Sequence, residues 1–418
     1  MSSSAAVKER ELLYKLIISQ LRYDGFETVA TNLAKSIAGS LAACSSSSRL
    51  AHLVDLGLKT DEEQQPTSLG FFPKAMPTNL DLEYGRDDVP STCPTACDYD
   101  TVCVIPHKGQ CTAAAFSPDG QLAATGSYDT SVKIVDVERI VTKSDQNAIH
   151  EIYPTIRTLY DHTEAVTCIE FHPLAPILAT GGDDCKVKFF EFSKPSTKRA
   201  FKSITEVVPV RCMAFHPTGD YLLVGTEHPT IRLYDFNTLT CYVSANPKDQ
   251  HSGPITSIRY SSNGKMYVSS SKDGTIKLWD SVSNRCVNTY PNAHSNMEVS
   301  SVTFSRNGKY CLSSGKDSIV NLWDISGGRI INTYKGAVQS HVRSQAVFNH
   351  TEDYVLMPDE KTVTVYCWNA RTAESTRPLS TAHSTAIGYL AHAPNVPAFI
   401  TCSEDYRARF WYSVRSNH

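Results

Sequence analysis

Residues 272–280 read KDGTIKLWD and residues 316–324 read KDSIVNLWD, so an acidic turn leads into a short strand that ends in Trp-Asp. Related dipeptides follow one another at intervals of 43–55 residues along most of the chain. They are Val135-Asp136, Phe190-Glu191, Tyr234-Asp235, Trp279-Asp280, Trp323-Asp324, Trp368-Asn369 and Trp411-Tyr412. A repeat of this length that ends in Trp-Asp is typical of propeller blades. The sequence therefore predicts an all-β propeller of seven blades.

Two segments of different character precede the repeats. Residues 1–58 carry apolar residues at spacings of three to five, which predicts a small all-α domain. So few helical residues bury little surface alone, and oligomerisation is the usual remedy. Residues 59–98 combine eight acidic residues with three basic ones and five prolines. This composition predicts an acidic, extended and largely disordered linker.

The propeller is expected to span residues 99–418 and to close on itself. The chain runs only six residues beyond Trp411-Tyr412, so the seventh blade lacks an outer strand of its own. The alternating run at residues 99–105 is predicted to supply that strand, which would remove the free edge. Deletion of residues 99–106 is then expected to destabilise the propeller, whereas deletion of residues 1–90 is not.

Five blades share an Asp six residues before the dipeptide and a His 22 or 23 residues before that Asp. The pairs are His107 with Asp129, His162 with Asp184, His251 with Asp273, His294 with Asp317, and His383 with Asp405. A His–Asp pair can serve catalysis, but five copies favour buried structural networks. The pattern resembles the WD-repeat family, where His, Ser/Thr, Asp and Trp, here Trp279, Trp323 and Trp411, tie the inner strands together.

Two blades depart from this pattern. His228 takes the place of the Asp in the third blade, and Asp359 and Glu360 are displaced in the sixth. Both blades are expected to lack the network and to hold by packing alone, which would leave their loops freer for partners. Residues 138–155 lengthen the first repeat as a polar loop, for which a partner-binding role and a neutral insertion are both open.

The resemblance also indicates a top face, formed by the residue before each turn Asp. These residues are Tyr128, Asp183, Glu227, Lys272, Lys316 and Glu404. Their charges are of mixed sign, whereas a nucleic-acid channel needs a basic stripe. Peptide binding through loops is therefore favoured, and direct sequence-specific nucleic-acid binding is not expected.

Composition excludes several other classes of function. The 418 residues are 41% hydrophobic and 20% charged with a net charge of −3, which suits a soluble protein. No apolar run is long enough to cross a membrane, and no signal peptide is recognisable, so a cytosolic or nuclear location is expected. The 13 cysteines are scattered singly, and Cys93 with Cys97 lacks a second pair for zinc. No motif predicts an enzyme, a metal or a cofactor.

The helical segment resembles a LisH dimerisation motif, although Gln20 stands where an aromatic residue is usual. Its predicted dimer interface comprises Leu13, Leu16, Ile17, Leu21, Phe26, Val29 and Leu33. An amphipathic helix pair packed on its own propeller is the alternative.

The whole chain resembles the WD-repeat subunits of cleavage stimulation factor. The resemblance rests on LLYKLIISQLRYD at 12–24, IRTLYDH at 156–162, KPSTKRAFK at 194–202, NHTEDYV at 349–355 and RARFWY at 407–412. It implies a nuclear, non-enzymatic scaffold for messenger-RNA 3′-end cleavage and polyadenylation. The implied partners are a second copy, the helical-repeat subunit, through it the RNA-recognition subunit, and the RNA polymerase II C-terminal domain. A substrate receptor of a cullin-type ubiquitin ligase and an RNA-binding propeller are the rival interpretations.

Overall fold

The structure is a computed structural model that describes residues 17–18, 21, 28–31, 80, 95, 98–145, 155–193 and 197–413. The chain divides into two compact units, Met1–Gly70 and Phe71–His418. In the first unit, residues 17–18, 21 and 28–31 are helical, and Ile18 and Ala30 are fully buried. No described helix is long and apolar enough to cross a membrane.

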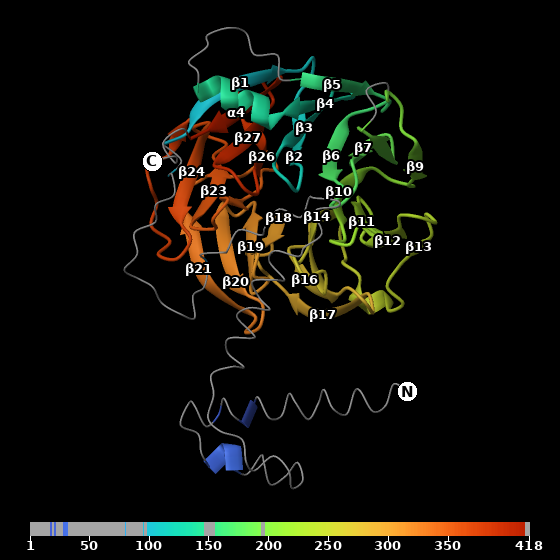
Figure 1. The fold of residues 1–418 in the computed structure, drawn as a ribbon, viewed down its shortest axis with the longest axis vertical. Helices are drawn as coiled ribbons and strands as arrows, with labels where there is room; N and C mark the ends of the chain where they lie inside the picture. The colour runs from blue at the N-terminus through green and yellow to red at the C-terminus, as the bar shows by residue number, and fades with distance from the viewer. Residues whose placement is uncertain are drawn as a thin grey trace. The chain divides into compact units, whose positions relative to one another are not determined.

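The second unit contains seven antiparallel four-stranded sheets arranged in a ring (Figure 1). The first three sheets are β2 (Cys111–Phe116), β3 (Leu122–Ser127), β4 (Ser131–Asp136) and β5 (Thr155–Tyr160); β6 (Val166–Phe171), β7 (Ile177–Gly182), β8 (Lys186–Glu191) and β9 (Lys202–Thr205); and β10 (Val210–Phe215), β11 (Tyr221–Thr226), β12 (Arg232–Asp235) and β13 (Cys241–Tyr242). The fourth to sixth are β14 (Ile255–Tyr260), β15 (Met266–Ser271), β16 (Ile276–Asp280) and β17 (Arg285–Tyr290); β18 (Val299–Phe304), β19 (Tyr310–Gly315), β20 (Ile319–Asp324) and β21 (Arg329–Lys335); and β22 (Val347–Phe348), β23 (Tyr354–Pro358), β24 (Thr364–Asn369) and β25 (Leu379–Ser380). The predicted seven-bladed propeller is confirmed.

The seventh sheet joins the two ends of this unit. It contains β26 (Ile387–His392), β27 (Ala398–Ser403), β28 (Arg407–Tyr412) and, as its outermost strand, β1 (Asp100–Pro106). The β1–β28 ladder runs from Asp100 opposite Tyr412 to Pro106 opposite Arg407. The backbone of β28 is thus paired on both sides, and the ring has no unpaired seam at this sheet.

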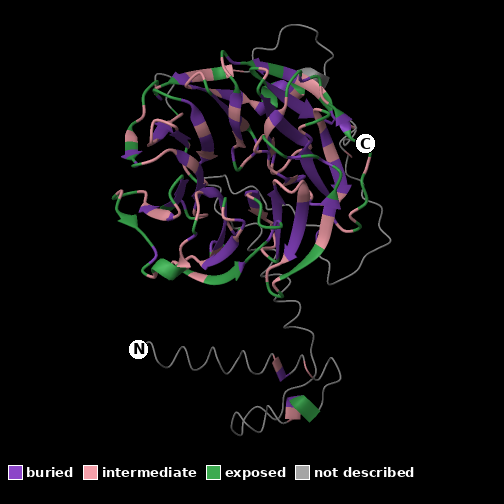
Figure 2. Cartoon of the chain, turned by 180° about the vertical axis from the view of Figure 1, so that it is seen from behind, coloured by how far each residue is buried: buried purple, intermediate pink, exposed green. Residues whose placement is uncertain are grey.

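Apolar side chains fill the spaces between neighbouring sheets. Figure 2 shows that buried residues concentrate along the strands, whereas exposed residues gather in turns and on the outermost strands. Between the fourth and fifth sheets, Leu278 and Tyr290 pack with Val299, Val302 and Trp323 in one buried cluster. Each sheet therefore depends on both neighbours to cover its two apolar faces.

The segment at 138–155 was expected to be a polar loop, and the structure corrects that expectation. Residues Val137–Asp145 form a helix, α4, whose first turn is capped by the Asp136 carboxylate, which accepts the backbone N–H of Arg139 at 2.9 Å. Ile140 is fully buried and packs with Cys103 and Ile105 of β1. The insertion thus covers the joint between the first and seventh sheets. Residues 146–154 lie outside the described part.

One residue of the predicted linker belongs to the propeller core. Leu80 is fully buried in the cluster that includes Tyr310, Tyr334 and Trp368, between the fifth and sixth sheets. Its carbonyl oxygen accepts a hydrogen bond from the Asn307 side-chain N–H at 2.8 Å. The expectation that residues 1–90 add nothing to propeller stability is therefore wrong at Leu80, since a buried leucine contributes about 2–5 kcal/mol over alanine.

A series of N-terminal truncations separates the contribution of Leu80 to propeller stability from that of strand β1. A protein that begins at residue 91 should unfold at lower urea concentration than one that begins at residue 71, because it lacks Leu80. A protein that begins at residue 107 should show no cooperative transition, because the whole β1–β28 ladder is gone. Leu80→Ala in the full chain should reproduce the first effect, and Val282→Ala, at a side chain that is 92% exposed, should not. Equal urea midpoints for the proteins that begin at 71 and 91 would refute the role of Leu80.

Candidate functional site

Three sheets contain the full four-residue network. In the fourth, the His251 Nε2 lies 2.7 Å from the Ser269 hydroxyl, to which the Trp279 indole N–H donates at 2.8 Å. The His251 Nδ1 lies 3.3 Å from the Asp273 carboxylate. The fifth and seventh sheets have the same geometry. Their members are His294, Ser313, Asp317 and Trp323, and His383, Thr401, Asp405 and Trp411.

The first and second sheets use shorter versions of the network, since neither has a Trp at the dipeptide. His162 lies 2.8 Å from the Thr180 hydroxyl and 2.9 Å from the Asp184 carboxylate. In the first sheet, Asp129 is 3.8 Å from His107, and the Ser131 hydroxyl, 3.0 Å from the His107 Nδ1, bridges the two groups.

Burial favours the neutral histidine in three of these networks, and hydrogen bonds favour the charged carboxylate in the fourth sheet. Burial lowers the pKa of His107 to about 4, and the pKa values of His251 and His383 are also lowered, chiefly by burial. Burial alone would raise the pKa of Asp273, but hydrogen bonds from His251 and Thr275 outweigh it and hold that pKa well below its ordinary value. An uncharged buried histidine beside a fully bonded carboxylate ties strands together.

The third sheet was expected to hold by packing alone, and the structure contradicts this. Glu206 lies 22 residues before His228, where the other sheets have their histidine, and its side chain is buried. The Tyr234 hydroxyl donates to the Glu206 carboxylate at 2.7 Å, and Arg232 forms an ion pair with it. Val224 stands where the other networks have a serine or threonine hydroxyl. The Tyr234 side chain therefore reaches Glu206 directly. His228 is exposed and belongs to the turn.

The sixth sheet was expected to be held by packing alone as well, and this too is wrong. The buried Asp359 carboxylate accepts the backbone N–H groups of Val338 at 2.5 Å and Thr362 at 2.7 Å. Glu360 accepts the backbone N–H groups of residues 340, 341 and 342 at 2.8, 2.9 and 3.3 Å. The displaced acids therefore fasten the loop before β22, which sequence reasoning had left free for partners.

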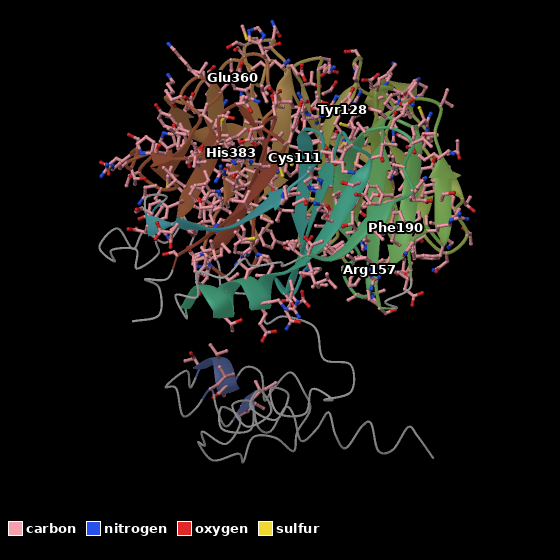
Figure 3. The ribbon with its side chains drawn as sticks, turned by 90° about the horizontal axis from the view of Figure 1, so that it is seen from above. Cys111, Tyr128, Arg157, Phe190, Glu360 and His383 are labelled. Atoms are coloured by element: carbon pink, nitrogen blue, oxygen red, sulfur yellow. The ribbon has the colours of Figure 1, made fainter. Side chains whose placement is uncertain are left out.

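The residues predicted for the top face differ in their exposure and in their ion pairs. Tyr128 is 61% exposed, and Figure 3 places it at the same face as Glu360, away from Phe190 and Arg157. Of the other five, three form ion pairs within the protein. Lys272 and Glu404 are exposed, Asp183 and Glu227 both pair with Arg211 at 2.9 and 2.6 Å, and Lys316 pairs with Glu298 at 3.1 Å. The mixed charge of this face is thus partly neutralised within the protein.

The central channel holds residues that sequence reasoning did not select. The innermost strand of six sheets carries a β-bulge near its start, and the bulged residues are Thr112, Thr167, Arg211, Thr256, Ser300 and Gly388. All six line a cavity of about 240 Å³. Bulges turn a side chain away from the regular ladder, so each sheet presents one residue to the channel.

The cysteines that line the channel are buried thiols of low reactivity. The ten described cysteines are free thiols, and seven of them are buried. Burial raises the pKa of Cys168 to about 12 and that of Cys212 to about 11, although both line the channel. Thiolates are the reactive form, so these side chains act as small apolar residues. In the described part of the chain, no cluster of His, Cys, Asp or Glu could hold a metal ion.

The proposed dimer interface is described at three of its seven positions. Ile17 and Leu21 are half-buried, and Val29 is 51% exposed although it is apolar and helical. Leu13, Leu16, Phe26 and Leu33 lie outside the described residues. Half-exposed apolar side chains on a short helical segment are compatible with a partner surface, and the interface stays a prediction.

The buried histidines predict a specific dependence of stability on pH. Burial lowers the pKa of His392 to about 3 and that of His107 to about 4, against 6.5 for an ordinary histidine. The unfolded chain therefore binds more protons below about pH 6.5, and stability should fall from there towards pH 4. From pH 7 to 5 each such histidine should lower the free energy of unfolding by about 2 kcal/mol. Urea denaturation at pH 7 and pH 5 measures this change in the free energy of unfolding. His392→Gln should make stability depend less on pH, and equal urea midpoints of the unsubstituted protein at both pH values would contradict the prediction.

The chain is similar to known proteins in both its N-terminal unit and its propeller. Residues 5–62 match the family described as cleavage stimulation factor subunit 1, dimerisation domain. Residues 100–136 and 154–191 match the WD domain, G-beta repeat, and residues 197–357 match the Vps8 beta-propeller. Cleavage stimulation factor subunit 50 of Arabidopsis thaliana is 37% identical over 410 residues, which cover 96% of this chain and 95% of that protein.

Other relatives share only part of the chain. The nuclear distribution protein nudF of Emericella nidulans is 31% identical over 137 residues, or 32% of this chain and 30% of its own length. The COMPASS component SWD3 of Saccharomyces cerevisiae is 25% identical over 192 residues, or 45% of this chain and 56% of its own length. Similarity to the Arabidopsis protein extends through the N-terminal unit and the propeller together, which a shared repeat does not explain. The chain therefore belongs to the cleavage stimulation factor subunit 50 family.

Proposed function

We propose that this protein is a non-enzymatic scaffold subunit of the cleavage stimulation factor, active in the nucleus in pre-mRNA 3′-end cleavage and polyadenylation. The observation that carries the proposal is the 37% identity to the Arabidopsis subunit over 96% of the chain. The match of residues 5–62 to the dimerisation domain supports a homodimer. The propeller would then bind the helical-repeat subunit, which in turn holds the RNA-recognition subunit.

The chemistry of the described residues supports a binding role. Four of the five His–Asp pairs are hydrogen-bonded directly, and Ser131 bridges the fifth. Burial also raises the pKa values of the Cys168 and Cys212 thiols. The mixed charges of the top face favour peptide contacts over a phosphate backbone. RNA is reached through the partner subunits, and dimerisation would double the number of RNA-reading modules. That raises affinity through effective concentration, without new base contacts.

The dimer is tested by two charged substitutions in the N-terminal unit. Leu16→Asp with Leu21→Asp should give a monomer with an intact propeller, because an unpaired charge in an apolar interface costs several kcal/mol. Sedimentation equilibrium of the full chain measures the mass, and the melting temperature reports on the propeller. Leu16→Ile with Leu21→Met conserves volume and should remain dimeric. An unchanged dimer in the charged variant would rule out this interface.

Complex membership is tested by affinity purification of the tagged chain from nuclear extract, with mass spectrometry of its partners. The helical-repeat and RNA-recognition subunits should be recovered together, and residues 71–418 alone should retain the helical-repeat subunit. Recovery of a cullin and its adaptor without these subunits would instead favour a ubiquitin-ligase receptor. RNA crosslinking by the isolated chain, with a steep dependence on salt, would favour an RNA-binding propeller.

A further inference from the structure

The channel wall contains a hydrogen bond that recurs between neighbouring sheets, except where Arg211, Ser300 and Gly388 replace the threonine. In the first, second and fourth sheets, the bulged threonine donates its hydroxyl to a carbonyl of the next sheet's first strand. The pairs are Thr112 with Val166, Thr167 with Val210 at 2.5 Å, and Thr256 with Val299 at 2.6 Å. Ser300 holds the same position in the fifth sheet, and its buried hydroxyl has no hydrogen-bond partner among the described residues. The sixth sheet begins late there, with β22 covering only Val347–Phe348.

Arg343 enters the channel at this break. It precedes β22, lines the cavity together with Ser300, and places its Nε 3.4 Å from the Ser300 carbonyl oxygen. That contact is long for a hydrogen bond and neutralises no charge. The Arg343 side chain is half-buried, and this partial loss of hydration lowers the pKa of its guanidinium group.

The other two arginines of the cavity are already compensated. Arg211 pairs with Asp183 and Glu227, and Arg259 pairs with Glu170 at 3.0 Å. Within the part of the chain that the structure describes, Arg343 has no carboxylate within ion-pair distance. The channel therefore contains one cation without an ion-pair partner, next to one buried hydroxyl with an unused donor. Glu298, which pairs with Lys316, acts on Arg343 only from beyond ion-pair distance.

The backbone on both sides of Arg343 is held in place. Glu360 accepts three backbone N–H groups from residues 340–342, and the Gln339 side chain donates to the Ser344 carbonyl at 2.9 Å. Glu360, which follows β23, and Gln339 thus hold the loop before β22 from two sides of Arg343 in the sequence. Preorganisation of this kind lowers the entropic cost of binding at the side chain that the loop carries.

We propose that the central channel is a binding site for an extended acidic peptide, whose side-chain carboxylate pairs with Arg343 and accepts a hydrogen bond from the Ser300 hydroxyl. The cavity of about 240 Å³ has room for a side chain and a short stretch of backbone, and excludes a folded element. Glu404, exposed at the rim of the same cavity, would favour a basic or neutral neighbour in that peptide.

The charges of the site select a carboxylate over a phosphate. A single negative charge balances the single uncompensated cation, whereas a phosphate dianion would add excess negative charge beside Glu170 and Glu404. Nucleic acid is disfavoured for the same reason, since Arg343 would have to serve a polyanion alone. The proposal is independent of complex membership, because it concerns a surface of the propeller itself.

An immobilised peptide library tests the site with the labelled full-length protein. The peptides are dodecamers with randomised flanks and one fixed central residue, which is Glu, Gln, phosphoserine or Lys. Binding to Glu-centred peptides should exceed binding to Gln-centred peptides by about tenfold or more, as expected for a charge-assisted hydrogen bond at a desolvated cation. Arg343→Gln should abolish that preference, and Arg285→Gln, at an exposed position on the outer strand β17, should keep it.

Three outcomes would overturn the proposal. They are equal binding of the Glu and Gln peptides, a preference for phosphoserine over Glu, and a Glu preference that survives in Arg343→Gln. Thermal melting gives a second readout that needs no ligand. If Arg343 serves binding, Arg343→Gln should raise Tm by about 2 °C or more, because a desolvated charge is removed. A fall in Tm would show that Arg343 serves the fold instead.

Discussion

The rest of the propeller depends on the backbone ladder between β1 and β28. Every sheet in the ring covers an apolar face of two neighbours, so an open seam would expose two faces at once. At this seam, one buried cluster contains Cys103 and Ile105 of β1, Cys111 of β2 and Ala398 of β27. A strand that comes before the first sheet in sequence thus completes the last sheet and makes the ring cooperative. The helix α4 covers the same joint through Ile140, which adds apolar burial where closure needs it.

The sheets share a hydrogen-bond geometry between their strands, although the residue types that form it differ from sheet to sheet. A buried acceptor near the start of the innermost strand must meet a donor from the third strand, because an unmet polar group there is costly. His251, Ser269 and Trp279 satisfy this with three side chains, whereas Glu206 and Tyr234 satisfy it with two. Exchange of a base for an acid is tolerated because Arg232 supplies the opposite charge.

Only those features of the fold that depend on local sequence patterns were predictable from the sequence alone. Periodicity and the Trp-Asp dipeptides predicted the seven sheets, because strand period and turn chemistry are local properties. Glu206 was missed because its role depends on the reach of Tyr234 across the sheet. Leu80 was missed for a related reason. A single apolar residue in an acidic, proline-containing stretch has no period, and its burial depends on the apolar cluster between the fifth and sixth sheets. The channel-lining residues could not be predicted either, because β-bulges orient them and neither composition nor spacing predicts a bulge.

The same distinction bears on how such a protein assembles with others. The ring is closed by β1 and hydrogen-bonded within all seven sheets, so its regular backbone is already ordered before a partner binds. The charges on its top face are partly neutralised within the protein, as Arg211 with Asp183 and Glu227 illustrates. Binding energy must then come from the few groups that folding leaves unsatisfied. In the described propeller, the guanidinium of Arg343 and the hydroxyl of Ser300 are such a pair, and Glu360 holds the loop that carries the arginine. A rigid frame with a small unsatisfied site suits a subunit that positions others, because selectivity then rests on few contacts while dimerisation supplies avidity.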